Sequence, residues 1–404
     1  MTPQKNISES WLIFIIGAVQ FINILDFMMV MPMGPDFAKT LGIPTHDIGW
    51  IGGIYTLAAA LSGLIGALFL DNYDRKKVLI FSMAGLLLAT LSCAMAWNFE
   101  SLLAARFLAG CFGGPLSSAA IAIIADNIPP ERRGSAMGKV MGAFSIASII
   151  GVPFGLEVSG LLGWQAPFIS LAIIGSGVLL AMAFKLPKQN KFTHHLKPSL
   201  RFMMMLSILK DRTSLATFLF MALAMMSGFM IIPNLSAHLQ FNLGYPRTDL
   251  GLLYFFGGIV SFFGMRIAGK FIDKYGAIKV VTLATAIVTL SILTGFVYYG
   301  HGVPIMLIFI CFMLAMSTRN VCGQTVSSKV PPPQERGAFN SLQSSFVHIS
   351  SAFGAFISSI ILVSDEQNHL INIEYVGLIS IALSLTAPFV MLYVLKKLKA
   401  RVLP

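Results

Sequence analysis

Three polar side chains lie near the middle of the first long apolar stretch of the chain, residues 11–33. Asp26 is accompanied by Gln20 and Asn23, which fall on the same broad face of a helix at these spacings. A carboxylate surrounded by hydrocarbon is disfavoured in its charged form, so we expect Asp26 to bind and release a proton. The alternative is a structural carboxylate that is hydrogen-bonded to neighbouring helices.

An arginine lies inside a later apolar stretch, residues 101–125. Arg106 is a functional candidate because a charged side chain in hydrocarbon is costly. Arginine does not deprotonate in practice, so Arg106 must be paired, hydrated or bound to an anionic substrate. The glycines that follow it, Gly110, Gly113 and Gly114, should let another helix approach closely.

Glu157 is the third charged candidate of the first half, and it follows Pro153 within residues 138–160. On an ideal helix Gly151 and Gly155 share a face, while Glu157 points about 160° away from Gly155, at about 100° per residue. The glycine face can therefore pack on a partner helix while Glu157 points into a cavity. A second proton site and a solvated glutamate at the membrane interface are both compatible with this position.

The second half of the chain contributes a different set of polar residues. Arg319 and Asn320 lie inside residues 303–328 and could bind a substrate carboxylate or phosphate, or Arg319 could pair with Asp26 or Glu157 across the cavity. His348 shares a helix face with Ser344, in a polar stripe suited to a bundle interior. Histidine titrates near neutral pH, but a hydrogen-bonded interior histidine is the more common outcome.

The elements that must position these residues are long and apolar. Hydrophobic residues make up 56% of the 404 residues and charged residues 11%, and the mean hydropathy is +0.79. A soluble domain of this composition would expose large apolar patches, whereas a helix of about 20 such residues spans a bilayer. We predict an all-α membrane protein with twelve transmembrane helices at 11–33, 47–70, 78–96, 101–125, 138–160, 165–185, 214–238, 250–269, 280–298, 303–328, 338–363 and 372–395.

Positive charge is distributed unevenly between the connecting segments. Most of the 28 lysines and arginines lie in alternate connections, and only Lys39 and Arg247 lie in the opposite ones. The positive-inside rule then places both termini in the cytoplasm, and it accounts for the net charge of +11 without a nucleic-acid partner. The four cysteines fall in predicted spans without CxxC spacing, so neither a disulfide framework nor a metal site is expected.

Two sequence markers occur twice at nearly the same separation. Asp-Asn-Tyr at 71–73 corresponds to Asp-Lys-Tyr at 273–275, and PPERRG at 129–134 corresponds to PPQERG at 332–337. A duplicated half with six helices explains both pairs. We predict an N-terminal bundle at 1–185, a cytoplasmic linker at 186–213 and a C-terminal bundle at 214–404.

These motifs resemble those of the major facilitator superfamily. Residues 67–77 (ALFLDNYDRKK) resemble the signature that follows helix 2 in that family, although Ala67 and Asp74 replace its usual glycines, and 269–276 (GKFIDKYG) is a closer copy. Residues 106–110 (RFLAG) resemble the helix 4 motif. Gly151, Pro153 and Gly155 (GVPFG) resemble the helix 5 packing motif of proton-driven exporters. The resemblance covers nearly the whole chain and is nearest to the twelve-helix drug:proton antiporter branch, which includes sugar-efflux-like members.

The resemblance carries expectations for several residues. It implies a proton-coupling role for the acid in helix 1, Asp26, and for Arg106, with Glu157 as a further candidate. It also implies a cytoplasmic gate that is closed in the outward-open state, although topology alone would place charges there too. The residues of that gate are Asp71, Arg75, Arg266, Lys270 and Asp273.

Together these features predict a secondary transporter that works by alternating access. We expect proton-coupled efflux (antiport) of a small organic compound, with the proton gradient as energy source and no cofactor. A proton symporter that imports a nutrient, organic acid or metal-chelating molecule is the first alternative, and a non-transporting membrane receptor the second. No HExxH, GxSxG or Walker-type motif indicates an enzyme. The expected partners are the substrate, protons and the lipid bilayer, with the chain monomeric in the inner membrane if bacterial.

Overall fold

The computed structural model describes residues 8–69, 73–186, 198–299, 302–332 and 334–402. Twelve helices of this described part are long and apolar enough to cross a membrane, which confirms the predicted fold class. The helices are α1 (Glu9–Met28), α2 (Gly34–Leu41), α3 (Ile48–Phe69), α4 (Arg75–Ala94), α5 (Phe99–Asn127), α6 (Pro130–Ile146), α7 (Val152–Leu162), α8 (Ala166–Lys185), α9 (Pro198–Lys210), α10 (Arg212–Ala237), α11 (Leu250–Tyr275), α12 (Ala277–Ile292), α13 (Ile305–Ser327), α14 (Arg336–Ile361) and α15 (Ile373–Val402).

Shorter elements join or extend these helices. They are the 3₁₀ turns η1 (Thr45–Asp47) and η5 (Arg247–Asp249), the π-helical segments η3 (Ala147–Gly151), η4 (His238–Asn242) and η6 (Leu293–Val297), and the antiparallel strands β1 (Val363–Ser364) and β2 (Leu370–Ile371). Segment η3 connects α6 and α7 into one span. Pro153 has no backbone N–H to donate, so the turn before it widens without ending the span.

The first helix is shorter than the sequence predicted. The apolar stretch extends to residue 33, but α1 ends at Met28 and the chain turns before entering α2. Pro32 lies in this turn and Pro35 in the first turn of α2, and proline ends a helix because it lacks an N–H and clashes with the preceding turn. The linker also contains a helix, α9, which the sequence analysis did not predict.

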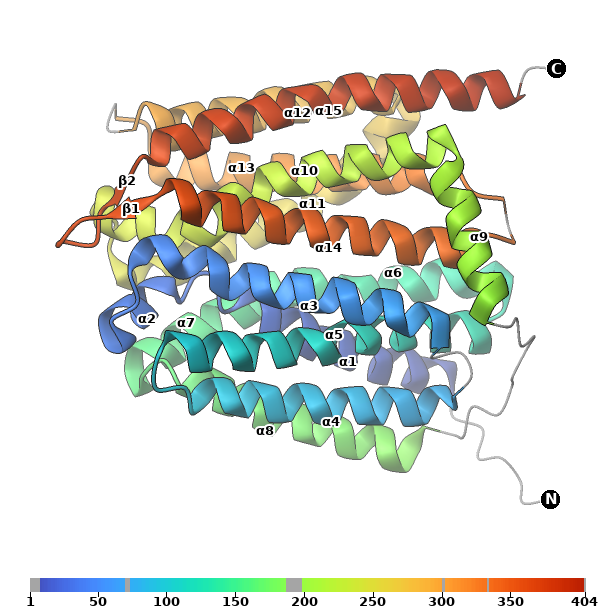
Figure 1. Cartoon of the computed structure of the whole chain (residues 1–404), viewed down its shortest axis with the longest axis horizontal. Helices are drawn as coiled ribbons and strands as arrows, with labels where there is room; N and C mark the ends of the chain where they lie inside the picture. Colours follow the sequence, from blue (N-terminus) through green and yellow to red (C-terminus); the bar gives the residue numbers. More distant parts are fainter. Residues whose placement is uncertain (1–7, 70–72, 187–197, 300–301, 333, 403–404) are drawn as a thin grey trace.

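The six spans from α1 to α8 occupy one half of the molecule and the six from α10 to α15 the other (Figure 1). Helix α9 crosses one end and contacts α3 of the first half and α10 and α14 of the second. Helix α1 begins and α15 ends at this same end, which we call the linker end. The opposite end carries η1, α2 and the two strands, and we call it the hairpin end. The predicted domain limits, 185 and 214, stay a prediction.

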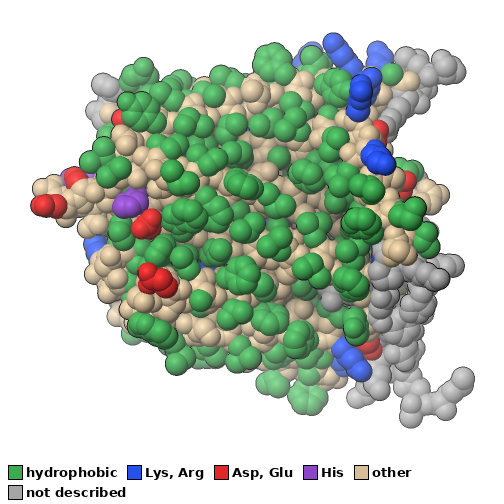
Figure 2. All heavy atoms as spheres, viewed as in Figure 1, with side chains coloured by type: hydrophobic (Ala, Val, Ile, Leu, Met, Phe, Trp, Pro, Cys, Tyr) green, Lys and Arg blue, Asp and Glu red, His purple; other side chains and the backbone are tan. Residues whose placement is uncertain are grey.

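The flank of the molecule between the two ends is apolar (Figure 2). Large hydrophobic side chains such as Phe14, Leu88 and Phe389 are at least two-thirds exposed there. Charged side chains gather near the two ends instead. This is the surface of a protein whose flank faces lipid tails, because no water-soluble fold leaves so much apolar area uncovered.

Candidate functional site

A buried ion pair lies inside the first half. Nη1 of Arg106, on α5, is 2.9 Å from Oδ2 of Asp26, on α1, and neither side chain is exposed at all. The hydroxyl of Thr90, on α4, donates to Oδ1 of Asp26 at 2.7 Å. Three helices thus meet at one carboxylate, and both of its oxygens accept a hydrogen bond.

The other side of the Arg106 guanidinium faces an aromatic ring. Its Cζ lies 4.5 Å from the ring centroid of Tyr55, and its Nε and Nη2 have no hydrogen-bond acceptor in the described structure. The Tyr55 hydroxyl donates to Oδ1 of Asn23 at 3.2 Å, and Nδ2 of Asn23 donates to the Gly113 carbonyl. Gln20 donates to Ser117 one turn further along α1. Asp26 and Asn23 of the predicted polar face of α1 therefore belong to one network with α3 and α5, and Gln20 makes a separate contact with α5.

Small residues allow the helices of this network to approach. A Cβ at Gly114 would lie 2.5 Å from the Ala59 carbonyl oxygen of α3, and one at Gly110 would clash with the Tyr55 carbonyl. The prediction that this glycine run receives another helix is confirmed. Close approach of α3 places Tyr55 on the guanidinium and excludes water from the ion pair.

The Asp26 carboxylate can either form the ion pair with Arg106 or carry a proton. While Asp26 is ionised, Arg106 holds it, because separating two buried opposite charges leaves each of them uncompensated. A proton on Asp26 removes the attraction and leaves Arg106 as a free cation. A pair with this chemistry can therefore respond to a proton on the carboxylate.

Glu157 lies apart from this pair. It is exposed on α7, near the hairpin end, and its Oε1 is 3.1 Å from the position that a Cβ on Gly251 of α11 would occupy. Glu157 forms neither an ion pair nor a hydrogen bond with Asp26 or Arg106. Its predicted role in proton coupling stays a prediction.

The helix 5 motif packs its glycines on α1. A Cβ on Gly151 would lie 2.6 Å from Cδ1 of Leu25, and one on Gly155 would lie 3.5 Å from Cβ of Met29. Pro153 lies between them in the first turn of α7. The expected contact of this glycine face with a partner helix is therefore present, and its partner is the helix that carries Asp26.

Arg319 is buried in the second half and pairs with no acid among the described residues. Its Nη1 donates to Oγ of Ser384, on α15, at 2.8 Å and lies 3.8 Å from Sδ of Met316. Its Nε and Nη2 have no acceptor in the described structure, and Oδ1 of the neighbouring Asn320 has no donor. Of the alternatives left open by the sequence, pairing with Asp26 or Glu157 is not what the structure shows.

The polar stripe of α14 faces the axis between the two halves. Phe353 and Ile360 are exposed on the lipid side of α14, and Ser344 points about 180° away from Phe353, at about 100° per residue. Ser344 is nevertheless exposed and His348 is partly exposed, whereas Ser351, further toward the hairpin end, is buried. The axis is therefore accessible from the linker end and closed further in.

The described residues of the predicted cytoplasmic gate lie on α4 and α11. Nε of Arg75 is 2.8 Å from Oδ2 of Asp126, within the first half. Arg266, Lys270 and Asp273 are exposed. Asp71 lies outside the described residues. The cytoplasmic gate therefore stays a prediction.

Contacts at the hairpin end join the two halves, and sequence reasoning missed them. Asp36 of α2 accepts from Nε and Nη2 of Arg247 at 3.1 and 2.8 Å, and from the hydroxyl of Ser159 at 2.6 Å. We call these three residues the Asp36 cluster. Nearby, the rings of Trp50 on α3 and Phe356 on α14 stack with centroids 4.5 Å apart. The sequence did contain one signal: Arg247 is one of only two basic residues, with Lys39, in the connections opposite to those that carry most of the lysines and arginines.

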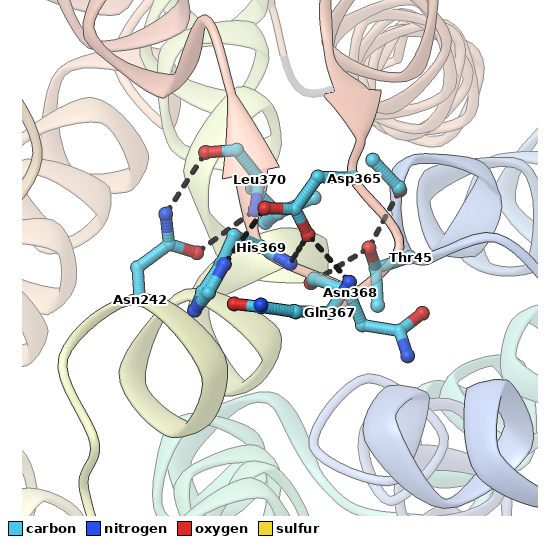
Figure 3. A network of polar contacts seen from close by, with 8 residues as sticks. Thr45, Asn242, Asp365, Gln367, Asn368, His369 and Leu370 are labelled. Carbon is cyan, nitrogen blue, oxygen red and sulfur yellow. Dashed lines mark hydrogen bonds and ion pairs between the residues drawn. The ribbon is translucent and has the colours of Figure 1, made fainter.

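The β1–β2 hairpin adds a second connection at this end (Figure 3). The Asp365 carboxylate accepts from the His369 ring and from two backbone N–H groups of the turn, and these bonds hold the pKa of Asp365 below its usual value. Asn242 of η4 exchanges two hydrogen bonds with the Leu370 backbone, and Thr45 of η1 donates to the Asn368 carbonyl. The hairpin therefore ties the first half to the second.

Twelve apolar spans arranged in two halves form the architecture of a secondary transporter. The family profile of the Major Facilitator Superfamily matches residues 16–221 and 217–403, so the chain belongs to that superfamily. It is thus an integral multi-pass membrane transporter and not an enzyme, and members of the superfamily generally work without a cofactor.

Individual known proteins agree with this assignment. The MFS-type transporter YbcL of Bacillus subtilis is 26% identical over 384 residues, which are 94% of this chain and 95% of YbcL. A protein of Helicobacter pylori described as "Probable sugar efflux transporter" is 22% identical over 392 residues, 96% of each chain. A solved bacterial homolog of the human lysosomal transporter Spinster, inward-facing and occupied, matches with a TM-score of 0.76 at 15% identity, over 96% of this chain and 97% of that one.

Proposed function

We propose that this transporter exports a small organic compound in exchange for protons, by alternating access. The observation that carries the proposal is the Asp26–Arg106 pair, a carboxylate and a guanidinium 2.9 Å apart with neither exposed. Intramembrane ion pairs of this kind mark proton relays and substrate pathways. The similarity to a protein described as a sugar efflux transporter supports the direction of transport.

A chain of aromatic contacts connects the Asp26–Arg106 pair with the second half. The Tyr55 ring lies between the Arg106 guanidinium and the ring of Phe27, with centroids of the two rings 5.2 Å apart. Phe27 follows Asp26 in α1 and stacks on Phe229 of α10, at 5.9 Å. A proton on Asp26 frees Arg106 and Tyr55 to shift, and Phe27 carries that shift to α10.

The described state is assigned to the inward-open form. We place the linker end in the cytoplasm because the basic connections lie there. The hairpin end then faces outward and is closed by the Asp36 cluster and the hairpin. A cargo would enter from the cytoplasm along the stripe of Ser344 and His348. Protonation of Asp26 from outside and release inward would complete the cycle, in the inner membrane of a bacterial cell and with the chain as a monomer.

The test is lumenal pH in proteoliposomes of known protein orientation. A panel of drugs, sugars, organic acids and siderophore-like compounds is added outside, to the wild type, to Asp26→Asn and to the control Glu100→Gln. Glu100 is an exposed carboxylate on the same helix as Arg106. Antiport predicts substrate-dependent alkalinisation of the lumen in the wild type and the control, and none in Asp26→Asn.

Other outcomes separate the alternatives. Acidification of the lumen on substrate addition would identify a proton symporter and reverse the proposed direction. Full proton movement in Asp26→Asn would remove that carboxylate from the mechanism. Substrate uptake without any pH change, followed with a labelled compound, would mean transport that is not coupled to protons.

A further inference from the structure

Each half contains a buried arginine, but among the described residues only the arginine of the first half has a counter-charge. Arg106 is neutralised by Asp26, whereas Arg319, which is 1% exposed, has only the Ser384 hydroxyl and the Met316 sulfur near one nitrogen. The other two guanidinium nitrogens of Arg319 lack acceptors in the described structure. A buried cation without a counter-charge is costly and calls for a partner that the protein itself does not supply.

No acid of the second half can reach this position. Within its six spans the sequence has only Asp249, Asp273 and Glu374, and each lies within three residues of a span end. Arg319 lies eight residues before the end of α13, about 12 Å inside it at about 1.5 Å per residue. The buried acid of the first half, Asp26, is already bound to Arg106. Among the described residues Arg319 therefore has no carboxylate as a counter-ion.

A polar path leads from the accessible end of the axis toward Arg319. Gln324 is exposed, and Asn320, one turn away on the same face of α13, has an unpartnered Oδ1. Ser344 of α14 is exposed on the axis as well. Met316 also touches the guanidinium, with its Sδ 3.8 Å from Nη1, and its unbranched side chain can change rotamer without displacing a helix.

We propose that Arg319 binds an anionic group, a carboxylate or a phosphate, that is carried by the transported compound. The guanidinium presents two free N–H groups in a planar fork, which matches the two oxygens of such a group. The assignment of the anion to the cargo rests on the proposed export function, but binding of the anion does not require proton coupling.

The test measures anion-dependent stability of the purified full-length protein in detergent. Unfolding is followed by the reaction of a fluorogenic maleimide with the buried thiols of Cys93 and Cys322. Sodium benzoate, sodium phosphate and sodium chloride are titrated separately, with benzamide as the neutral match for benzoate. The variants are Arg319→Met, Arg319→Lys and the control Arg266→Met, which removes an exposed arginine of the same half.

Benzoate or phosphate should raise the unfolding temperature saturably, by at least about 2 °C, in the wild type and in Arg266→Met. Benzamide should have no effect, Arg319→Met should lose the response, and Arg319→Lys should retain a weaker one. Equal responses in Arg319→Met, or none to either oxyanion in the wild type, would overturn the proposal. A response to chloride as strong as to benzoate would overturn the assignment to a cargo group.

This experiment is independent of the proton-coupling test. Asp26→Asn should keep the anion response, because Asp26 belongs to the other half. Loss of proton movement in liposomes with an intact anion response would refute only the proposed coupling, and the reverse pattern would refute only the anion site.

Discussion

The same substitution in the two halves should change stability in opposite directions. At an effective dielectric constant of about 20, unit charges 2.9 Å apart attract by about 6 kcal/mol. Part of this is offset by the desolvation of the pair, so Arg106→Met should destabilise the protein by about 3–5 kcal/mol. Arg319→Met removes an uncompensated charge and loses one hydrogen bond, to Ser384, worth about 1 kcal/mol. A net gain of about 1–3 kcal/mol is expected for Arg319→Met, because an apolar side chain of similar size replaces a buried ion.

The assay is unfolding by sodium dodecyl sulfate in mixed micelles, followed by far-ultraviolet circular dichroism. The control is the double variant Asp26→Asn with Arg106→Met, which has no unpaired charge and should regain most of the loss seen in Arg106→Met. If Arg319→Met were destabilised as strongly as Arg106→Met, Arg319 would have a counter-charge that the structure does not show. The reasoning behind the anion site would then fail.

Arg247→Gln removes the cation of the Asp36 cluster and should destabilise the closed arrangement of the hairpin end by about 1–2 kcal/mol. The ratio of closed to open molecules should then fall by about 5–30-fold. A cysteine placed at the buried Ser351 should then react faster with a water-soluble maleimide, and an unchanged rate would contradict this role of the cluster. Thr90→Val removes the hydroxyl that donates to Oδ1 of Asp26 and leaves that buried oxygen without a hydrogen bond, so the protein should be destabilised by about 1–3 kcal/mol; unfolding at the same dodecyl sulfate fraction as wild type would contradict this role of Thr90. The pKa of Asp365 is lower in the folded hairpin than its ordinary value of 3.8. The hydrogen bonds of the carboxylate therefore stabilise the hairpin fully at a pH above 3.8, and this stabilisation is lost as the pH falls below that value. Asp365→Asn should speed amide hydrogen exchange of residues 363–371 at neutral pH, and protection equal to wild type would show that the carboxylate does not hold the turn.

The spans could be predicted from sequence because lipid imposes a length and a composition on every helix that crosses it. Asp26 and Arg106 could each be singled out for the same reason, since a charge in hydrocarbon is rare. Their pairing could not be predicted. It depends on how α1 and α5 are placed relative to each other, which the glycines of α5 and the position of Tyr55 determine together.

The connections at the hairpin end were harder to predict. Asp36 and Arg247 are separated by 211 residues and lie outside the helices' apolar patterns, where charged residues are ordinary. The hairpin has only two residues in each strand, too few for an alternating pattern to stand out. Such contacts follow from the closed arrangement of the two halves, and one sequence carries no information about which arrangement is populated.

The stack of Trp50 on Phe356 makes the chain its own optical reporter. The two rings come from different halves and lie against each other at the hairpin end. When that end opens, Trp50 must leave Phe356 and meet water or lipid, and its emission changes colour and intensity. The other three tryptophans, Trp11, Trp97 and Trp164, all lie in the first half and can be replaced to leave one fluorophore. Switching between the two states could then be followed in real time, in liposomes, without any label.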